Sequence, residues 1–152
     1  MEERLTHVDE TGKARMVDVS GKKPVRRTAT AAGRIDLAPA TVALVRANGI
    51  AKGDVLAVAR LAGIMGAKRA SDLIPLCHNI EIEHVEVALR VEDDCIEIEA
   101  RAVCTDKTGI EMEALTAVSV AALAVWDMCK AVDKEMRIRD IRLLEKTKEE
   151  AK

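Results

Sequence analysis

Two neighbouring segments of the chain alternate between apolar and polar residues. In residues 85–91, Val85, Val87 and Leu89 are separated by charged or small residues, and residues 96–101 repeat this order after an acidic turn. Alternation with a period of two is typical of β-strands that bury one face and expose the other. The pattern therefore predicts an antiparallel hairpin with one solvated face.

Two further segments have the apolar spacing of helices that bury one side. In residues 39–49, Pro39 stands where the first turn of a helix tolerates proline, and Gly49 supplies a stop signal. In residues 52–70, apolar residues recur three and four positions apart after Asp54, an acidic residue suited to a helix start. We expect one helix in each segment.

The longest apolar stretch, residues 114–126, lies within a third helical segment, residues 107–136. It is interrupted by Thr116 and Ser119 and stops at Asp127. A membrane-spanning helix needs about 20 predominantly apolar residues, which is more than this stretch provides. The segment therefore predicts a buried helix of a globular fold, and we expect no contact with a membrane.

The remaining segments complete the order of elements. Residues 27–37 and 137–146 alternate loosely and predict strands, whereas residues 1–25 predict an irregular or flexible arm and residues 147–152 a charged tail. The order strand, helix, helix, strand, strand, helix, strand is typical of an α+β fold with helices on one face of an antiparallel sheet. Since the sequence contains no internal repeat or linker, we expect residues 1–152 to form a single domain.

Composition restricts both the core and the partners. Hydrophobic residues make up 49% of the chain and charged residues 33%, but Trp126 is the only aromatic residue. Small and aliphatic side chains must therefore fill the core, which suits Ala-rich helices packed closely on a sheet. A net charge of −2 gives no overall attraction to nucleic acid or to anionic membranes. The first ten residues are charged and lack an apolar signal core, so we expect a cytoplasmic protein.

The four cysteines do not indicate a disulfide framework. None belongs to a Cys-x-x-Cys pair, and no signal directs the chain to an oxidising compartment, so we expect reduced thiols. A metal site that uses Cys77, His78 and a distant partner is an alternative. Adjacent residues seldom both bind one tetrahedral zinc ion, and we therefore predict no metal site.

Asp127 and Lys130 are the first candidates for chemistry. They are three residues apart and so occupy neighbouring positions on the third predicted helix. One interpretation is a surface ion pair of little energetic consequence. The other is a proton-transfer pair, because aspartate is unfavourable inside a helix and a lysine beside buried apolar surface loses its proton more readily.

Glu111 and Glu113 open the same helix. Acidic residues at a helix N-terminus can simply offset the helix dipole, which is the simpler interpretation of Glu111. Glu113 lies within about 40° of the face that carries Asp127, but the helix rise between them separates the two residues by ~21 Å. If both serve one small-molecule site, either the ligand is long or another chain completes the site.

Cys77 and His78 stand in a loop, because Pro75 ends the preceding helical region. A hydrogen-bonded structural histidine is the simpler interpretation of His78, and a residue that faces a cleft is the alternative. Basic residues such as Lys52 and Lys146 could hold phosphates, although scattered basic residues are usually solvated. The sequence has no Gly-rich phosphate-binding motif, so side chains would have to hold a nucleotide.

Three stretches together resemble a known family. They are LTHVDETGKARMVDVS at residues 5–20, KGDVLAVARLAGIMGAKRASDLIPLCHNI at residues 52–80 and KTGIEMEALTAVSVAALAVWDMCKAVDKEM at residues 107–136. The chain resembles the cyclic pyranopterin monophosphate synthase family, which acts second in molybdenum cofactor biosynthesis. The likeness covers residues 5–146, and Asn79 stands where the family commonly has a proline.

The resemblance implies a ferredoxin-like α+β subunit in a homohexamer, a trimer of dimers with active sites at subunit interfaces. It also implies that 3′,8-cyclo-7,8-dihydro-GTP, made by a radical partner enzyme, is converted to cyclic pyranopterin monophosphate with loss of pyrophosphate. Such a reaction needs several proton transfers and positive groups on the departing oxygens. It requires no redox cofactor. A divalent metal can accompany the triphosphate, although no carboxylate cluster in the sequence demands one.

The resemblance also implies roles for particular residues. Asp127 is expected to be the catalytic acid/base and Lys130 its partner. The residues expected to bind the substrate are Leu76, Cys77, His78, Glu111, Met112 and Glu113, and those expected around its phosphates are Lys52, Arg26 and Lys146.

Two other classes of function stay open at this point. Nucleic-acid-binding modules on such sheets usually stack bases on aromatic residues, and the predicted strands contain none. The second alternative is a non-catalytic oligomeric protein that binds anionic nucleotides. Turnover of the cyclised substrate separates that protein from an enzyme.

Overall fold

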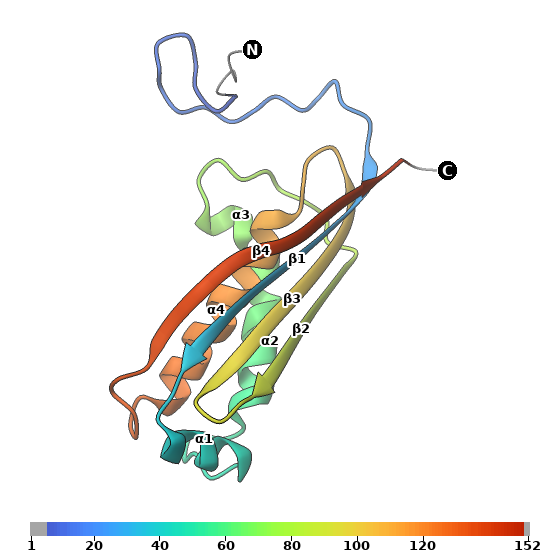
Figure 1. The fold of residues 1–152 in the computed structure, drawn as a ribbon. Coiled ribbons are helices and arrows are strands. Elements are labelled where there is room, and N and C mark those ends of the chain that lie inside the picture. The colour runs from blue at the N-terminus through green and yellow to red at the C-terminus, as the bar shows by residue number, and fades with distance from the viewer. Residues whose placement is uncertain (1–5, 151–152) are drawn as a thin grey trace.

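The computed structural model describes residues 6–150 and leaves residues 1–5 and 151–152 outside the description. The order of elements is the predicted one, with one short helix added (Figure 1). The elements are β1 (Val25–Asp36), α1 (Pro39–Arg46), α2 (Val55–Lys68), α3 (Ala70–Leu73), β2 (His84–Val91), β3 (Cys95–Asp106), α4 (Glu111–Cys129) and β4 (Arg137–Glu149).

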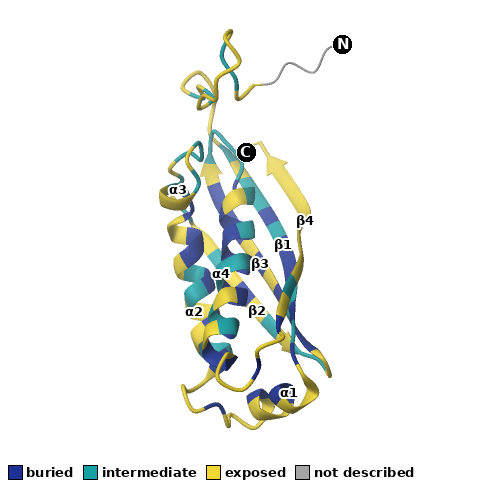
Figure 2. Ribbon diagram, turned by 90° about the vertical axis from the view of Figure 1, so that its left-hand side faces the viewer, coloured by how far each residue is buried: buried dark blue, intermediate teal, exposed yellow. Residues whose placement is uncertain are grey.

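The four strands form one antiparallel sheet in the order β2-β3-β1-β4. The long helices α2 and α4 lie side by side on one face of this sheet, and no helix of the described residues covers the other face (Figures 1 and 2). The predicted α+β fold, with helices on one face of an antiparallel sheet, is confirmed. The strand order and the two crossovers are those of the ferredoxin-like arrangement.

The core is built from small side chains, as the composition predicts. Ala31 and Ala100 of the sheet and Ala114, Ala117 and Ala121 of α4 are completely buried. By length and composition alone α4 could cross a membrane. Its burial between α2 and the sheet identifies it instead as the core helix of this fold (Figure 2).

Two glycines allow α2 to approach α4 closely. A Cβ atom added to Gly63 would lie 3.0 Å from the carbonyl oxygen of Ala117, and one added to Gly66 would lie 2.8 Å from the Cβ of Val120. Glycine inside a helix lowers helix propensity. Here the two glycines let α2 lie directly against the middle of α4, at Ala117 and Val120.

β4 is longer than predicted. Residues 147–149, which the sequence assigns to a charged tail, instead continue the strand, and Glu149 pairs with Arg26 of β1. β4 is an edge strand with mostly exposed side chains, so its backbone pairs while its charges stay in water. Residues 151–152 of the predicted tail lie outside the described residues.

α1 ends before the glycine that the sequence marks as its stop. Asn48 adopts a φ of 52°, and the amide of Gly49 donates to the carbonyl of Leu44 at 2.8 Å. Asparagine tolerates this left-handed conformation better than most residues, so Asn48 and Gly49 end the helix together. Asp54 caps α2 as expected, since its Oδ1 accepts a hydrogen bond from the Ala57 amide at 3.0 Å.

The arm before β1 has little regular structure. Residues 6–24 contain turns and an isolated bridge between Val8 and Ala14, but no helix or strand. Val25, which the sequence places in the arm, begins β1. Residues 1–5 of the predicted arm lie outside the described residues.

Candidate active site

Asp127 forms ion pairs with two lysines at the C-terminal end of α4. Its Oδ1 lies 2.7 Å from Nζ of Lys130, and its Oδ2 lies 3.0 Å from Nζ of Lys52. Lys52 comes from the loop before α2 and also donates to the main-chain carbonyl of Asp127 at 2.8 Å. Asp127 and Lys130 therefore lie together, and Lys52, expected near phosphates, joins them. These three residues form the Asp127 cluster.

The two ammonium groups keep the Asp127 carboxyl ionised. The hydrogen bond from Lys130, followed by that from Lys52, lowers the pKa of Asp127. The side chains of Asp127, Lys130 and Lys52 are 59%, 54% and 42% exposed. Exposed ion pairs stabilise a fold little, so stability gives no reason for this arrangement. It can instead accept a proton at the carboxylate and bind or protonate an anion at the ammonium groups.

A second group of side chains lies at the N-terminal end of α4. The Glu113 side chain is buried; its Oε1 lies 3.8 Å from Sγ of Cys77, and its Oε2 has no hydrogen-bond partner among the described residues. Burial raises the pKa of Glu113. Burial, together with the neighbouring carboxyl, also raises the pKa of Cys77 to about 11. Both shifts favour the protonated forms.

Cys77 and His78 are directed to different neighbours. Cys77 contacts α4, whereas Nε2 of His78 lies 2.7 Å from the carbonyl oxygen of Val17 in the arm. A carbonyl only accepts, so this contact places the ring proton on Nε2. The arm therefore packs against the loop that contains the half-buried Leu76, and Met112 is exposed at the start of α4.

Glu111 differs from Glu113 although both belong to the first turn of α4. The Oε1 of Glu111 lies 3.0 Å from Nζ of Lys146 on β4. Burial opposes the ionisation of Glu111, but the hydrogen bonds from its own amide and from Lys146 outweigh burial and lower its pKa. Glu111 is therefore an ionised partner of Lys146.

A hollow of about 330 Å³ lies beside this ion pair, and Arg27, Lys146 and Lys148 contribute to its lining. Its three positive groups outnumber the ionised Glu111, which also lines the hollow, and this excess of positive charge suits a phosphate-bearing ligand. The sequence points to Arg26 rather than Arg27, but successive side chains of a strand face opposite sides. Arg27 of β1 pairs with Lys148 of β4, which brings these two residues together. The loosely alternating sequence of β4 does not predict which residue of β1 each of its residues faces.

The Asp127 cluster and the Glu113 group lie at opposite ends of one unbroken helix. Because α4 continues from Glu111 to Cys129, a rise of 1.5 Å per residue separates Glu113 from Asp127 by ~21 Å. One chain alone does not bring both groups to the same reacting atom.

Within residues 6–150, no three His, Cys, Asp or Glu side chains come together in a group that could hold a metal ion. Cys77 and His78 find no third ligand there. All four cysteines are free thiols.

Comparison with known proteins shows the family of the whole chain. A model of the MoaC family matches residues 16–149. The chain belongs to the MoaC family. It is 60% identical to the cyclic pyranopterin monophosphate synthase of Streptomyces coelicolor, over 96% of this chain and 86% of that protein. Two proteins of the same name are similarly close. The one from Thermomicrobium roseum is 59% identical over 93% of this chain and 87% of the relative. The one from Heliobacterium modesticaldum is 60% identical over 94% of this chain and 91% of the relative.

In this MoaC family member, the matched region contains every residue expected in the site. It includes Arg26 near its start and Lys146 near its end, with both ends of α4 between them. It also contains Arg27 and Lys148, which line the basic hollow.

Proposed function

We propose that this chain converts 3′,8-cyclo-7,8-dihydro-GTP to cyclic pyranopterin monophosphate with release of pyrophosphate, as a lyase of molybdenum cofactor biosynthesis. The Asp127 cluster carries the proposal, because it sets an ionised carboxylate between two ammonium groups that solvent reaches. Membership of the MoaC family and the identity to enzymes with this name support the reaction.

The Asp127 cluster supplies the proton transfers. Opening a purine-derived ring and closing a pyranopterin requires a base to take protons and an acid to return them. Asp127 is the base, because Lys130 and Lys52 keep its carboxyl ionised and so able to accept a proton. Lys130 and Lys52 each hold one carboxylate oxygen, which fixes the orientation of the base and places two proton donors beside it.

The basic hollow at the other end of α4 binds the phosphate-bearing part of the substrate. Arg27, Lys146 and Lys148 place three positive charges there, and such charges stabilise a departing pyrophosphate. Glu111 holds Lys146 in position. Arg26 is exposed on the opposite side of β1 and does not line this hollow, so its expected contact with the phosphates stays a prediction.

We also propose that the active unit is a homohexamer, a trimer of dimers with sites between subunits. The ~21 Å between Glu113 and Asp127 supports this assembly, because a neighbouring chain can bring its own Asp127 cluster to the Glu113 group. Exposed apolar side chains on the outer faces of the helices, among them Leu61, Met65 and Leu123, support a contact between copies.

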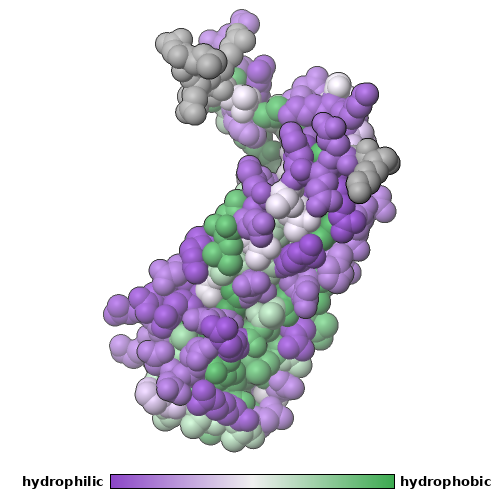
Figure 3. Space-filling view, turned by 45° about the vertical axis from the view of Figure 1, so that its right-hand side comes forward, coloured by the Kyte–Doolittle hydropathy of each residue, from purple (hydrophilic) through white to green (hydrophobic). Residues whose placement is uncertain are grey.

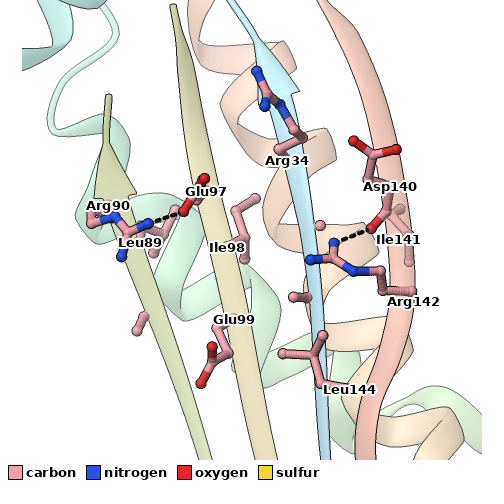
Figure 4. Close-up of a pocket in the computed structure, with 13 residues that line it drawn as sticks. Arg34, Leu89, Arg90, Glu97, Ile98, Glu99, Asp140, Ile141, Arg142 and Leu144 are labelled. Carbon is pink, nitrogen blue, oxygen red and sulfur yellow. Dashed lines mark hydrogen bonds and ion pairs between the residues drawn. The ribbon is translucent and has the colours of Figure 1, made fainter. Parts of the chain in front are cut away.

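The open face of the sheet supports a second contact between copies. Leu89 and Leu144 help to line a hollow of about 650 Å³ on this face, with charges of both signs around it (Figure 4). Figure 3 shows hydrophobic residues gathered along the middle of one side of the molecule, between hydrophilic flanks. An apolar patch with a charged rim is typical of a protein interface, and mixed charges allow a second copy to pair with the first.

The proposed reaction also defines the remaining partners. A radical enzyme that cyclises GTP must supply the substrate, and no redox cofactor is needed for the step itself. A divalent metal can accompany the triphosphate. Because GTP is a cytoplasmic metabolite, we place the protein in the cytoplasm. The four strands contain no Phe, Tyr or Trp, and one histidine, His84, at the start of β2, so stacked nucleic-acid bases are not the proposed ligand.

Mass spectrometry of the product tests the proposed function. The purified protein is incubated with the cyclised dihydro-GTP, and pyrophosphate is measured in the same sample. We expect cyclic pyranopterin monophosphate and pyrophosphate in equal amounts. A folded, assembled protein that yields neither product overturns the proposal, and binding without turnover favours the non-catalytic nucleotide-binding alternative.

A further inference from the structure

Oε2 of Glu113 is the only buried side-chain oxygen or nitrogen without a hydrogen-bond partner among residues 6–150. Glu113 is 3% exposed and belongs to the first turn of α4. Native proteins rarely leave such an atom without a partner. A ligand atom bound beside Oε2 would supply the missing hydrogen-bond partner.

The surroundings of Glu113 offer too few donors for a buried carboxylate. Sγ of Cys77 lies 3.8 Å from Oε1 of Glu113, but it also lies 3.6 Å from the carbonyl oxygen of His78, and a thiol has one proton for both. The other ionisable groups that face Glu113 are Glu111 on α4 and Asp106 and Cys104 at the end of β3. Each of these is an acid or a thiol, so none supplies a positive charge.

These surroundings favour the neutral, protonated form of the Glu113 carboxyl group. Burying a charged carboxylate with only its own amide and the weak Cys77 thiol as donors is unfavourable, whereas the neutral acid carries a donor of its own. The helix N-terminus favours an anion. At Glu113, however, burial outweighs the effect of the helix N-terminus and raises the pKa of the carboxyl group.

We propose that burial holds Glu113 as a neutral carboxylic acid, that its contact with Cys77 orients it, and that it donates a hydrogen bond from Oε2 to a carbonyl oxygen or imine nitrogen of the substrate ring. The identity of the substrate rests on the proposed function, but the neutral state of Glu113 does not. Cys77 is then a positioning residue. Its own pKa of about 11 keeps the thiol protonated and available as the partner of Oε1.

The contrast with Glu111 gives the two carboxyl groups separate roles. Glu111 is ionised and holds Lys146, whereas Glu113 is buried among acids and thiols. Two carboxyl groups whose surroundings drive their pKa values apart can act as an anion and as a proton-bearing acid in the same site. Glu113 therefore recognises an acceptor atom, and Glu111 organises a positive charge.

Infrared spectroscopy tests the neutral state without any substrate. At neutral pH, the wild type is expected to show the carbonyl stretch of a protonated carboxyl group, and Glu113→Gln is expected to lose it. Glu111→Gln is the matched control, because Glu111 is ionised and its removal leaves the band. A wild type without the band, or an unchanged band in folded Glu113→Gln, overturns the proposal.

Unfolding at a series of pH values gives a second measurement. A raised pKa means that Glu113 stabilises the folded state fully below its ordinary pKa and loses this contribution as the pH rises towards the raised value. Glutamine is neutral at every pH. The Tm of Glu113→Gln is therefore expected to rise relative to wild type across that interval, at constant protein concentration. A difference in Tm that does not vary with pH counts against the neutral state.

Substrate affinity tests the donor role. Glutamine keeps a neutral donor, so Glu113→Gln is expected to bind the cyclised dihydro-GTP within about tenfold of wild type. Glu113→Ala removes the donor and is expected to lose more. If Glu113 acts as a carboxylate, Glu113→Gln loses affinity on the order of a hundredfold, and the donor role is wrong. Failure of turnover in every protein, with the infrared band present, refutes the proposed function and leaves the neutral state standing.

Substitutions of Cys77 test the positioning role. Cys77→Ala is expected to shift the infrared band of Glu113 and to raise KM more than it lowers kcat, because the acid loses the contact that orients it. Cys77→Ser keeps a donor at this position and is expected to restore both values towards wild type. An unchanged band and KM in Cys77→Ala overturn the role of Cys77.

Discussion

Lys52 and Asp127 lie far apart in the sequence but are joined twice in the fold. Nζ of Lys52 lies 3.0 Å from Oδ2 and 2.8 Å from the main-chain carbonyl oxygen of Asp127. That carbonyl belongs to the last turn of α4, where carbonyl groups lack their usual helical partner. Lys52 therefore caps the helix end and orients the carboxylate in one contact. The loop before α2 thus controls the geometry of the Asp127 cluster.

We expect Asp127→Asn to fold and assemble normally but to form product at least about a hundredfold more slowly, which is the usual size of a general acid–base contribution. The amide keeps the shape of the side chain but cannot take a proton. Product formation is measured by mass spectrometry, with circular dichroism as the control for folding. Wild-type turnover in Asp127→Asn removes this residue from the catalytic step.

The pH dependence of this variant follows from the lowered pKa of Asp127. A depressed folded pKa contributes stability above the ordinary aspartate pKa, and this contribution is lost as the pH falls through the folded value. Wild type and Asp127→Asn should therefore differ in Tm at neutral pH and converge in acid. The difference should be small, because the ion pairs are exposed.

We expect Lys52→Ala and Lys130→Ala to lose product formation as Asp127→Asn does. Each change removes one of the two ammonium groups that orient the carboxylate and donate protons beside it. Lys134→Ala is the matched control, since Lys134 is an exposed lysine outside the cluster, a few residues after Lys130. Steady-state kinetics of the three variants give the comparison. Equal activity in all three reduces the cluster to a surface ion pair.

The sequence predicts those parts of the fold that depend on local periodicity. The hairpin of β2 and β3 was found because one of its faces is buried, which imposes a period of two. The last residues of β4 were not found, because both faces of an edge strand are exposed and its charged residues carry no such period. The sequence assigns the stop of α1 to Gly49 alone, because glycine is the commoner stop signal, and does not predict the left-handed conformation of Asn48.

The site was predicted less completely, because its contacts join distant parts of the chain. The spacing of Asp127 and Lys130 showed that they are neighbours on one helix. Nothing local connects Lys52 to them, since that contact depends on how α2 packs on α4. The hydrogen bond between His78 and Val17 and the unpartnered oxygen of Glu113 are likewise products of tertiary packing.

We expect Gly63→Ala to lower the free energy of unfolding by about 1–3 kcal/mol. The added Cβ would lie 3.0 Å from the carbonyl oxygen of Ala117, which is backbone and cannot rotate away, so α2 must shift from α4. Thermal unfolding measures the loss. Gly21→Ala is the matched control, because a Cβ at Gly21 meets no atom within 4 Å. Equal Tm values for both variants would show that the helices separate without cost.

The final prediction concerns the two ends of α4. Glu113→Ala and Asp127→Asn should each impair product formation, yet a mixed oligomer of the two variants should recover part of the activity. If a site takes Glu113 from one chain and Asp127 from a neighbour, then subunit exchange creates some sites in which both residues are intact. The ~21 Å between these residues along one helix makes a site within one chain unfavourable.

The exchange is verified by native mass spectrometry, and each variant incubated alone serves as its control. Because each intact site needs one wild-type Glu113 and one wild-type Asp127 from different chains, recovery should rise as the two variants approach equal amounts. A mixed oligomer of confirmed composition that stays as impaired as its parents would show that each site draws both residues from the same chain. In that outcome a long ligand, rather than a second subunit, must bridge the two ends of α4.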